Sequence, residues 1–260
     1  LTLPANGWLG VSATYPRAVE IARTASKGIV ATYSASADAD YRAQDVTFAE
    51  DGARFVIAGP RGEATPVLLP MSGMHNVENA VGVWAAARSL DLTPDVIAGG
   101  FANFLGVKRR QEPRGYAGGV LVIDDFAHHP TAVRETIAGI RQRYPDRRLW
   151  AVFEPRSNTS RRNIHQAEYS GAFDHADVVT IRLPEPHDKV PVDQQLDVPA
   201  IVREISRRGI QASAHAHVEE IVELLATRAR AQDVILVMSN GAFGGLIPSL
   251  LAALEKRTNG

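Results

Sequence analysis

Short alternating runs of hydrophobic and polar residues mark the stretch from Tyr41 to Pro70. Turn-forming residues interrupt these runs at 50–52 (Glu-Asp-Gly) and at 59–62 (Gly-Pro-Arg-Gly). A period of two places every second side chain on the same face of the backbone. The pattern therefore predicts antiparallel strands joined by tight turns.

Helical spacing replaces this alternation after the strands. From Asn76 to Leu90 the hydrophobic residues recur every three or four positions, with many alanines between them, which predicts an amphipathic helix. Thr93 and Pro94 predict the start of a second helix, because Thr is a favourable N-cap and Pro is tolerated at the first helical position.

The pattern changes again after Gly106. The stretch from Lys108 to Gly115 is basic and polar and offers few residues for a core, so we expect a linker there. Beyond it, hydrophobic runs of strand length alternate with helical patterns, which is typical of a parallel sheet covered on both faces. We therefore expect an α/β fold whose C-terminal domain is doubly wound, mostly parallel and Rossmann-like. The expected strands are 120–124, 149–153, 177–181, 210–214 and 233–238, and the expected helices are 131–143, 163–173, 198–207, 218–231 and 245–256.

Composition narrows the class of protein. A chain of 260 residues favours two domains, since single cores rarely grow beyond ~250–300 residues. Its 28 basic and 29 acidic side chains create no general field for nucleic acid or an anionic membrane, so we expect neither as a partner. The chain has no cysteine and no hydrophobic run of about 18 residues, so we expect a cytoplasmic protein without a membrane span. The absence of a first Met suggests a piece cut from a longer protein.

Ligands of open α/β sheets sit beyond the carboxyl ends of the strands. The first C-terminal strand ends in Asp124-Asp125-Phe-Ala-His128-His129-Pro. One Asp there could accept hydrogen bonds from a ribose diol, or the four polar side chains could ligate a metal. Helix capping by an Asp, with a His satisfying a backbone group, is the structural alternative.

The next strand ends in Glu154-Pro-Arg156-Ser157-Asn158-Thr159. An Arg can bind a carboxylate or phosphate through two parallel hydrogen bonds, and the residues after it add donors. This stretch therefore predicts an anion pocket, although an Arg-rich, solvated helix start explains it equally well.

Two further segments are candidates. Ser239-Asn240-Gly241 is followed by Ala-Phe and two more glycines. The glycines let the backbone approach a ligand ahead of a helix N-terminus, although turn geometry alone explains them just as well. His75 and Asn79 share a helix face, and Asn76 lies one residue round. Side-chain amides of this kind can bind the edge of an adenine. Helix capping there would need only Asn76 or Ser72.

One absence is equally informative. A P-loop requires a Lys directly after a Gly, and none of the four lysines, Lys27, Lys108, Lys189 and Lys256, follows a glycine. The chain itself therefore has no Walker A motif for the β- and γ-phosphates.

Taken together, the motifs resemble those of the Mur ligases. The resemblance rests on His75-Asn76-x-x-Asn79-Ala, on Gly106-Val-Lys-Arg109-Arg110, on the loop at 124–130 and on Phe-Glu-Pro-Arg at 153–156, in the family's order. It covers nearly the whole chain. Within the family, the stretches at 153–159 and 238–245 are most similar to ligases that join UDP-N-acetylmuramate to L-alanyl-γ-D-glutamyl-meso-diaminopimelate in cell-wall recycling. Alanine-adding members usually have a Phe-Gln-Pro-His type of stretch instead.

The resemblance implies an ATP- and Mg²⁺-dependent ligase that forms an amide through an acyl phosphate. Residues 1–107 would be the C-terminal part of the ATPase domain and 108–260 the amino-substrate domain. The UDP-sugar domain, the P-loop and most Mg²⁺ ligands would lie outside this chain, so we expect it to be inactive alone and assign it no metal ligand. Its substrates would be UDP-N-acetylmuramate and a muramyl peptide.

Roles for single residues also follow from the resemblance. Asn76 and Asn79, with His75 beside them, would hold the adenine, and Asp125 would take the ribose hydroxyls as one domain folds over the nucleotide. Either Arg109 or Arg110 would reach the phosphates, with Arg110 favoured. The remaining implied residues are His128 and His129 near the reacting groups, Arg156, Ser157, Asn158 and Thr159 at a carboxylate of the peptide, and Asn240 and Gly241 beside that peptide.

Three alternatives remain open. The first is the alanine-adding ligase of the same family. The second is a metal-dependent hydrolase centred on Asp124, Asp125, His128 and His129, for which only His187 and Asp188 offer further ligands. The third is a nucleotide- or peptide-binding module without catalysis.

Overall fold

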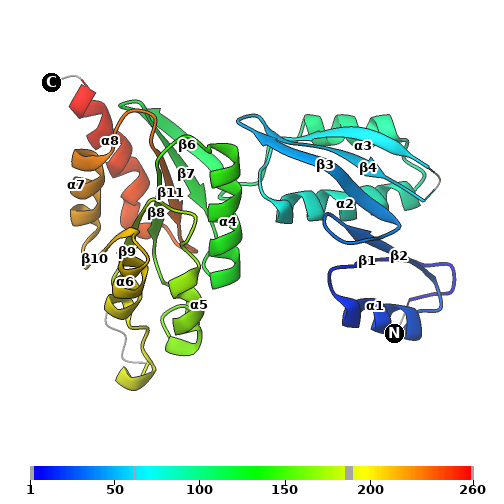
Figure 1. Cartoon of the computed structure of the whole chain (residues 1–260), viewed down its shortest axis with the longest axis horizontal. Helices are drawn as coiled ribbons and strands as arrows, with labels where there is room; N and C mark the ends of the chain where they lie inside the picture. Colours follow the sequence, from blue (N-terminus) through cyan, green and yellow to red (C-terminus); the bar gives the residue numbers. More distant parts are fainter. Residues whose placement is uncertain (1–2, 61, 185–189, 259–260) are drawn as a thin grey trace. The chain divides into compact units, whose positions relative to one another are not determined.

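A computed structural model describes residues 3–60, 62–184 and 190–258 of the chain (Figure 1). The chain divides into two compact units, Leu1–Gly106 and Val107–Gly260. His187 and Asp188, the two outlying candidates for a metal site, fall outside the described residues. None of the described helices combines the length and the apolar character that crossing a membrane requires.

The first unit is built on a five-stranded sheet in the order β1-β2-β3-β4-β5. The first three strands are parallel and the last three antiparallel, which confirms the antiparallel strands predicted between 41 and 70. Gly52 turns the chain between β3 and β4 at a φ of +133°, where a Cβ would lie 2.0 Å from the carbonyl oxygen of Leu69. Only glycine fits this turn. The strands are β1 (Trp8–Ser12), β2 (Ile29–Ser34), β3 (Tyr41–Ala49), β4 (Gly52–Ala58) and β5 (Ala64–Leu69).

Three helices accompany this sheet: α1 (Pro16–Ala25), α2 (Met74–Ser89) and α3 (Pro94–Ala102). The apolar face of α2 is fully buried against the sheet, as its spacing predicts, with Trp84 0% exposed. Thr93 lies at the N-cap of α3 in an extended conformation, but its side chain makes no capping hydrogen bond.

The second unit is built on a six-stranded sheet in the order β10-β9-β8-β11-β7-β6. All pairs are parallel except β6 with β7, so the expected doubly wound, mostly parallel sheet is confirmed. Strand β11 enters between β7 and β8, which brings the loops after these three strands together. The strands are β6 (Glu112–Ala117), β7 (Val120–Asp125), β8 (Leu149–Phe153), β9 (Val178–Arg182), β10 (Gln211–His215) and β11 (Val234–Met238).

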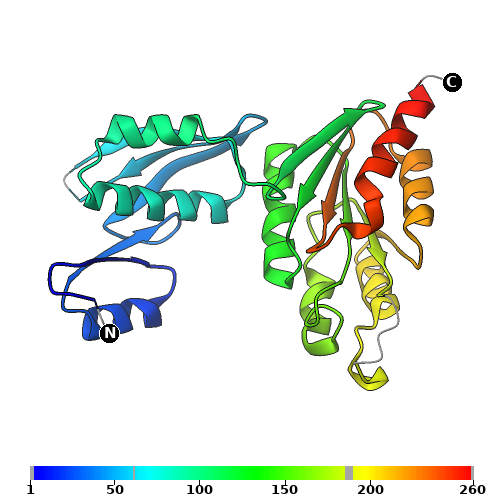
Figure 2. The ribbon, with the colours of Figure 1, turned by 180° about the vertical axis from the view of Figure 1, so that it is seen from behind.

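Helices cover both faces of this sheet, and alternate strand residues point to one face or the other. Helices α4 (Pro130–Arg143), α5 (Gln166–Gly171) and α6 (Val198–Arg207) pack on the face that carries Ile123 and Phe153. Helices α7 (Val218–Arg228) and α8 (Leu246–Thr258) pack on the opposite face, which carries Trp150. Figure 2 shows α8, in red, lying along the green strands at the edge of the sheet.

The linker prediction is wrong for part of its length. Residues 112–117 form the edge strand β6, because Tyr116 and its neighbours pair in register with β7 and Ala117 reaches the core. Pro113 lies in this edge strand, next to a register shift between Pro113 and Gly115. Pro is tolerated there because an edge strand has N–H groups that need no partner. Only the few residues before 112 connect the two units without joining a sheet.

Candidate functional site

The carboxyl ends of β7, β8, β9 and β11 meet at one edge of the second unit's sheet. Met238 pairs with Asp125 on one side and with Phe153 on the other, and Phe153 pairs in turn with Ile181. The loop at 124–130 and the loop at 154–160 therefore start at the same edge, as two parts of one ligand site would require.

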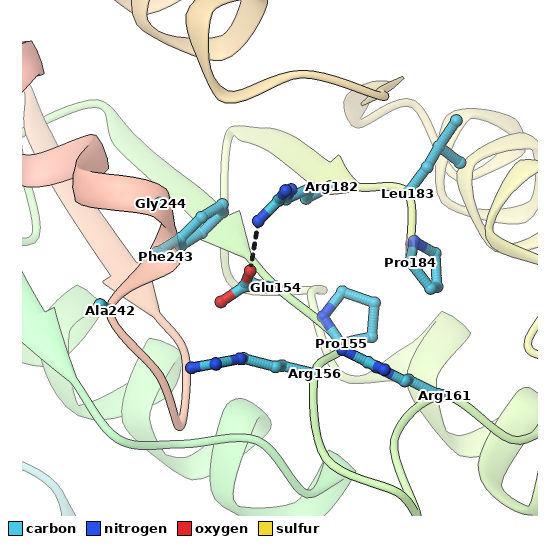
Figure 3. A pocket seen from close by; sticks show the side chains of 10 residues that line it. All are labelled: Glu154, Pro155, Arg156, Arg161, Arg182, Leu183, Pro184, Ala242, Phe243 and Gly244. Atoms are coloured by element: carbon cyan, nitrogen blue, oxygen red, sulfur yellow. Dashed lines mark hydrogen bonds and ion pairs between the residues drawn. The ribbon is translucent and has the colours of Figure 1, made fainter. Parts of the chain in front are cut away.

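A pocket of about 340 Å³ opens at this edge (Figure 3). Three arginines and one glutamate supply its charge, while proline, leucine and phenylalanine side chains supply apolar walls. Its lining consists of Glu154, Pro155, Arg156, Arg161, Arg182, Leu183, Pro184, Ala242, Phe243 and Gly244.

Glu154 is the buried acid of this pocket, with 6% of the residue exposed. Its Oε1 accepts a hydrogen bond from Nη1 of Arg182 at 2.6 Å, and its Oε2 accepts one from the Ser239 hydroxyl at 2.6 Å. The hydroxyl of Ser239 also accepts the backbone N–H of Gly241 at 2.9 Å. This buried ion pair thus fixes Arg182 and the start of the loop after β11 in one arrangement.

Arg156 extends from the end of β8 toward the loop after β11 (Figure 3). A Cβ built on Gly241 would lie 1.6 Å from Nη1 of Arg156, so the guanidinium lies directly against the glycine. Arg156 is exposed and forms no ion pair with any described residue. Its charge is therefore available to a ligand.

Arg161 supplies a second cation. Its Nε is buried and has no hydrogen-bond partner among the described residues. A buried donor without an acceptor is costly, typically ~1–3 kcal/mol, and a bound anion would remove that cost. Glu154 pairs with Arg182, so Arg156 and Arg161 are the two cations of the pocket that have no acidic partner among the described residues.

The residues after Arg156 behave differently from what the sequence suggests. The Ser157 hydroxyl is bonded to the hydroxyl of Ser160 at 2.8 Å and accepts the Ser160 N–H at 3.0 Å, so it caps a turn. Asn158 and Thr159 are exposed and do not line the pocket. Asn240, in the loop after β11, has a buried Oδ1 with no hydrogen-bond partner among the described residues, which leaves it an acceptor for a ligand N–H.

Asp125 is occupied by its own chain. It is 2% exposed, its Oδ2 accepts the Gln111 N–H at 2.8 Å, and its Oδ1 accepts the Ala127 N–H at 2.7 Å. Burial raises the pKa of this carboxyl, and the two backbone N–H groups oppose that rise in part. Asp124 also has a pKa raised by burial, opposed by Arg109 and Arg114 at 3.6 and 3.7 Å.

The two arginines that precede β6 have different environments. Nη2 of Arg109 donates to the carbonyl oxygens of Ser239 and Gly241, the latter at 2.7 Å. Arg109 is thus committed to the loop after β11. Arg110 is exposed and stacks over the Phe126 ring at 5.5 Å. Of the pair, Arg110 is the one whose charge a phosphate could recruit.

The two histidines of the loop after β7 point to separate partners. Nδ1 of His128 lies 2.9 Å from the carbonyl oxygen of Phe126. His129 is exposed at the N-cap of α4, with its ring edge-on to His165 at 4.6 Å. Within the described ranges, no three His, Asp or Glu side chains gather as a metal site would require.

The adenine-binding candidates lie in the first unit, at the start of α2. Nδ2 of Asn76 donates to the carbonyl oxygen of Ser72 at 2.8 Å, which supports the helix start. Asn79 is exposed, one turn further on, and His75 is half-buried. Asn79 therefore has the more accessible amide of the two asparagines.

Sequence reasoning did not foresee that Arg182 joins this pocket and pairs with Glu154. Arg182 is the last residue of β9, and Glu154 directly follows β8. Their pairing could have been found by reading every charged residue at a parallel strand end, because these ends converge. Arg161 lies in a turn whose path no periodicity predicts.

Two protein-family models match the sequence of this chain. The model of the Mur ligase glutamate ligase domain matches residues 109–241, and that of the Mur ligase middle domain matches residues 7–87. The chain belongs to the Mur ligase family. The resemblance inferred from the motifs is thereby confirmed, and ligases of this family form amide bonds at the expense of ATP.

Relatives of two substrate types are similar to this Mur ligase chain. The UDP-N-acetylmuramate–L-alanyl-γ-D-glutamyl-meso-2,6-diaminoheptandioate ligase of Escherichia coli is 36% identical over 187 residues, 71% of this chain and 38% of that protein. The UDP-N-acetylmuramate–L-alanine ligase of Gloeothece citriformis is 33% identical over 226 residues, 85% of this chain and 45% of that protein. The chain spans about half the length of the curated relatives it matches.

Two solved structures of Mur ligases have a fold similar to that of this chain. A murein peptide ligase from Psychrobacter arcticus is 29% identical with a TM-score of 0.65, over 97% of this chain and 52% of that one. The MurF ligase from Thermotoga maritima in complex with ADP has a TM-score of 0.74 at 19% identity, over 97% of this chain and 55% of that one. This second likeness supports the fold alone.

Proposed function

We propose that the chain supplies the acceptor half of an ATP-dependent ligase that joins UDP-N-acetylmuramate to L-alanyl-γ-D-glutamyl-meso-diaminopimelate. The observation that carries this proposal is the pocket with two arginines, Arg156 and Arg161, that have no acidic partner within the described part of the chain. The chain is similar both to ligases that use the tripeptide and to ligases that use L-alanine. The chemistry of the pocket therefore has to decide between these two acceptors.

The pocket's charge favours the peptide. L-Alanine has one carboxylate, which would neutralise one arginine and leave the other without an anion. A tripeptide that ends in diaminopimelate has three carboxylates joined by aliphatic segments, so two of them can meet Arg156 and Arg161. Leu183, Pro184 and Phe243 would then face the aliphatic parts, and the free Oδ1 of Asn240 would accept an N–H of the peptide.

For ATP, we propose roles that use the side chains left available. Asn79 and Asn76, with His75, would bind the adenine, and Arg110 would bring positive charge to the phosphates. Asp125 would have to become more accessible to bind ribose hydroxyls, since it is 2% exposed and each of its oxygens already accepts a backbone N–H. His128 and His129 would lie near the reacting groups.

In the proposed reaction, ATP phosphorylates the muramate carboxylate, and the peptide amine then displaces phosphate. The chain's part is to orient the peptide, because positioning of the two reactants supplies much of the acceleration of such a step. Mg²⁺ would neutralise charge on the phosphates, but the described residues offer no cluster to hold it, so we assign no residue of this chain to it. Because the reaction consumes ATP, we place it in the cytoplasm.

A chimera tests the proposal. The N-terminal half of the Escherichia coli relative is fused to this chain and supplied with UDP-N-acetylmuramate, ATP and either the tripeptide or L-alanine. We expect ligation of the tripeptide and little of alanine, measured by chromatography of the UDP product. Preference for alanine would assign the chain to the alanine-adding ligases instead.

The 260-residue chain alone should give no product. It has no Lys after a Gly to hold the β- and γ-phosphates, so phosphate release above background is not expected. Turnover by the isolated chain would contradict the assignment of the phosphate-binding part to another segment.

A further inference from the structure

Arg109 is held by more contacts than an ordinary connecting residue. Its guanidinium donates to the carbonyl oxygens of Ser239 and Gly241, lies 3.6 Å from Asp124 and stacks over Phe126 at 5.1 Å. Its backbone N–H donates to Oε2 of Glu112 at 2.7 Å, and its carbonyl oxygen accepts the Phe126 N–H, also at 2.7 Å. Such a set of contacts fixes both the backbone and the side chain.

The backbone around Arg109 is also unusual. Arg109 and Gln111 both have positive φ values, +58° and +50°. Residues other than glycine rarely adopt this region, and they stay there only when their surroundings enforce it. The contacts just described enforce it, so the segment is held in one specific conformation.

The loop that Arg109 holds is the loop that seats Arg156. The carbonyl oxygen of Gly241 accepts a hydrogen bond from Arg109, and the Cα of Gly241 lies against the Arg156 guanidinium. The same loop is bonded to Glu154 through the Ser239 hydroxyl. A continuous path of contacts therefore runs from the connecting segment to the cations of the pocket.

We propose that Arg109 is a positioning residue that holds loop 239–241 in place and thereby sets where Arg156 meets the carboxylate of an acidic peptide. Arg109 does not touch the ligand. Because it lies at the start of the second unit, three residues after the boundary at Gly106, a change in the backbone at 107–111 would alter the pocket's affinity. The pocket part of this inference rests on the proposed function, whereas the loop part does not.

The decisive variant is Arg109→Met, which keeps an unbranched side chain over Phe126 but removes every donor. Lys108→Met is the matched control, since it removes a neighbouring, exposed positive charge whose side chain forms no hydrogen bond or ion pair with a described residue. Amide hydrogen exchange of Gly241, whose N–H is bonded to Ser239, reports the loop without any ligand. Calorimetric titration of the 260-residue chain with L-alanyl-γ-D-glutamyl-meso-diaminopimelate reports the pocket.

We expect Arg109→Met to speed exchange of the Gly241 amide about tenfold and to weaken tripeptide binding five- to tenfold, with Lys108→Met equal to the wild type. Gly241→Ala should weaken binding by displacing Arg156, and adding it to Arg109→Met should cost little more, because both act through the same loop. A merely structural role would give additive losses.

Exchange in Arg109→Met equal to that in Lys108→Met would overturn the proposal. If Arg109→Met does not fold, Arg109→Lys decides in its place: we expect intermediate exchange, and wild-type exchange would count against Arg109. A wild-type chain that binds no tripeptide would refute the proposed pocket, while the exchange measurement would still decide whether Arg109 holds the loop.

Discussion

The loops after β7 and β8 begin at the same edge of the same sheet, yet their charged groups are in opposite situations. In the first loop, Asp124 and Asp125 are buried and every strong interaction they need comes from the chain itself, from Arg109, Arg114 and backbone N–H groups. In the second, Arg156 and Arg161 have no acidic partner among the described residues. The first loop is internally satisfied, and we propose that a ligand completes the second.

This difference teaches that a cluster of charged residues is not itself a site. A group contributes to ligand binding when folding leaves it unsatisfied, and it contributes to stability when folding satisfies it. Substitutions of groups that folding satisfies, such as Asp125 and Glu154, should therefore act on unfolding, and substitutions of Arg156 and Arg161 should act on binding. Four experiments can break or sharpen that contrast.

The largest effect is expected from Asp125→Ala. The change leaves the N–H groups of Gln111 and Ala127 buried without acceptors, which should lower the free energy of unfolding by about 3 kcal/mol. Urea denaturation at pH 7 measures it. Asp174→Ala is the control, because its ion pair with Arg208 involves a side chain that is 51% exposed, and it should cost under about 1 kcal/mol. Equal effects would mean that Asp125 is not a structural acid.

Glu154→Gln should come next. The amide can keep one hydrogen bond to Ser239 or Arg182 but loses the charge that strengthens both, so we expect a loss of about 1.5 kcal/mol in unfolding free energy. Glu204→Gln, whose exposed partner is Arg207, should change it by less than about 0.5 kcal/mol. A neutral Glu154→Gln would show that the pocket's ion pair does not stabilise the loop after β11.

Arg156→Gln and Arg161→Gln should leave stability unchanged and each weaken tripeptide binding about tenfold, as expected for loss of one charge-assisted contact. Arg162→Gln is the matched control, since Arg162 bonds Gln194 and does not line the pocket. Replacing diaminopimelate by lysine removes one carboxylate from the peptide. Substitution of the arginine that binds that carboxylate should then leave the affinity for the lysine peptide unchanged. If both substitutions still weakened binding about tenfold, the two-carboxylate interpretation would be wrong.

The smallest effect concerns pH. Burial raises the pKa of Asp124, so the folded state binds its proton more readily than the unfolded state does. Stability from this group is therefore greatest below its ordinary pKa of 3.8 and falls as pH rises toward the raised value. The stability of the wild type relative to Asp124→Asn should thus decrease as the pH rises above 3.8 and level off once Asp124 is ionised in both states. An increase would mean that Arg109 and Arg114 outweigh burial.

Much of the fold could be predicted from the sequence, because the spacing of hydrophobic residues matches the helices and strands of the structure. The helix expected at 198–207 is α6 with the same bounds, and the strand expected at 149–153 is β8. The edge strand β6 was not expected, because its Pro, Arg and Gly residues carry no hydrophobic pattern. Pairing with β7 overrides local preference there.

The candidate site was predictable in part for a similar reason. Strand ends identify where charged residues converge, so the position of Asp125 and Arg156 at one edge of the sheet was predictable. Sequence does not reveal which of them folding satisfies: Ser157 caps a turn, Arg109 binds carbonyl oxygens, and Arg182 pairs with Glu154. These outcomes depend on distances between residues far apart in the chain, which no spacing encodes.

The proline and the register shift in β6 have a further consequence. An exposed edge strand normally offers a row of N–H and C=O groups on which a foreign strand can add, and that is a common start of aggregation. Pro113 removes one of those donors, and the shift beside it interrupts the regular ladder. The β6 border of this sheet is thus a poor template for intermolecular pairing. Replacing Pro113 with a β-branched residue would remove that protection.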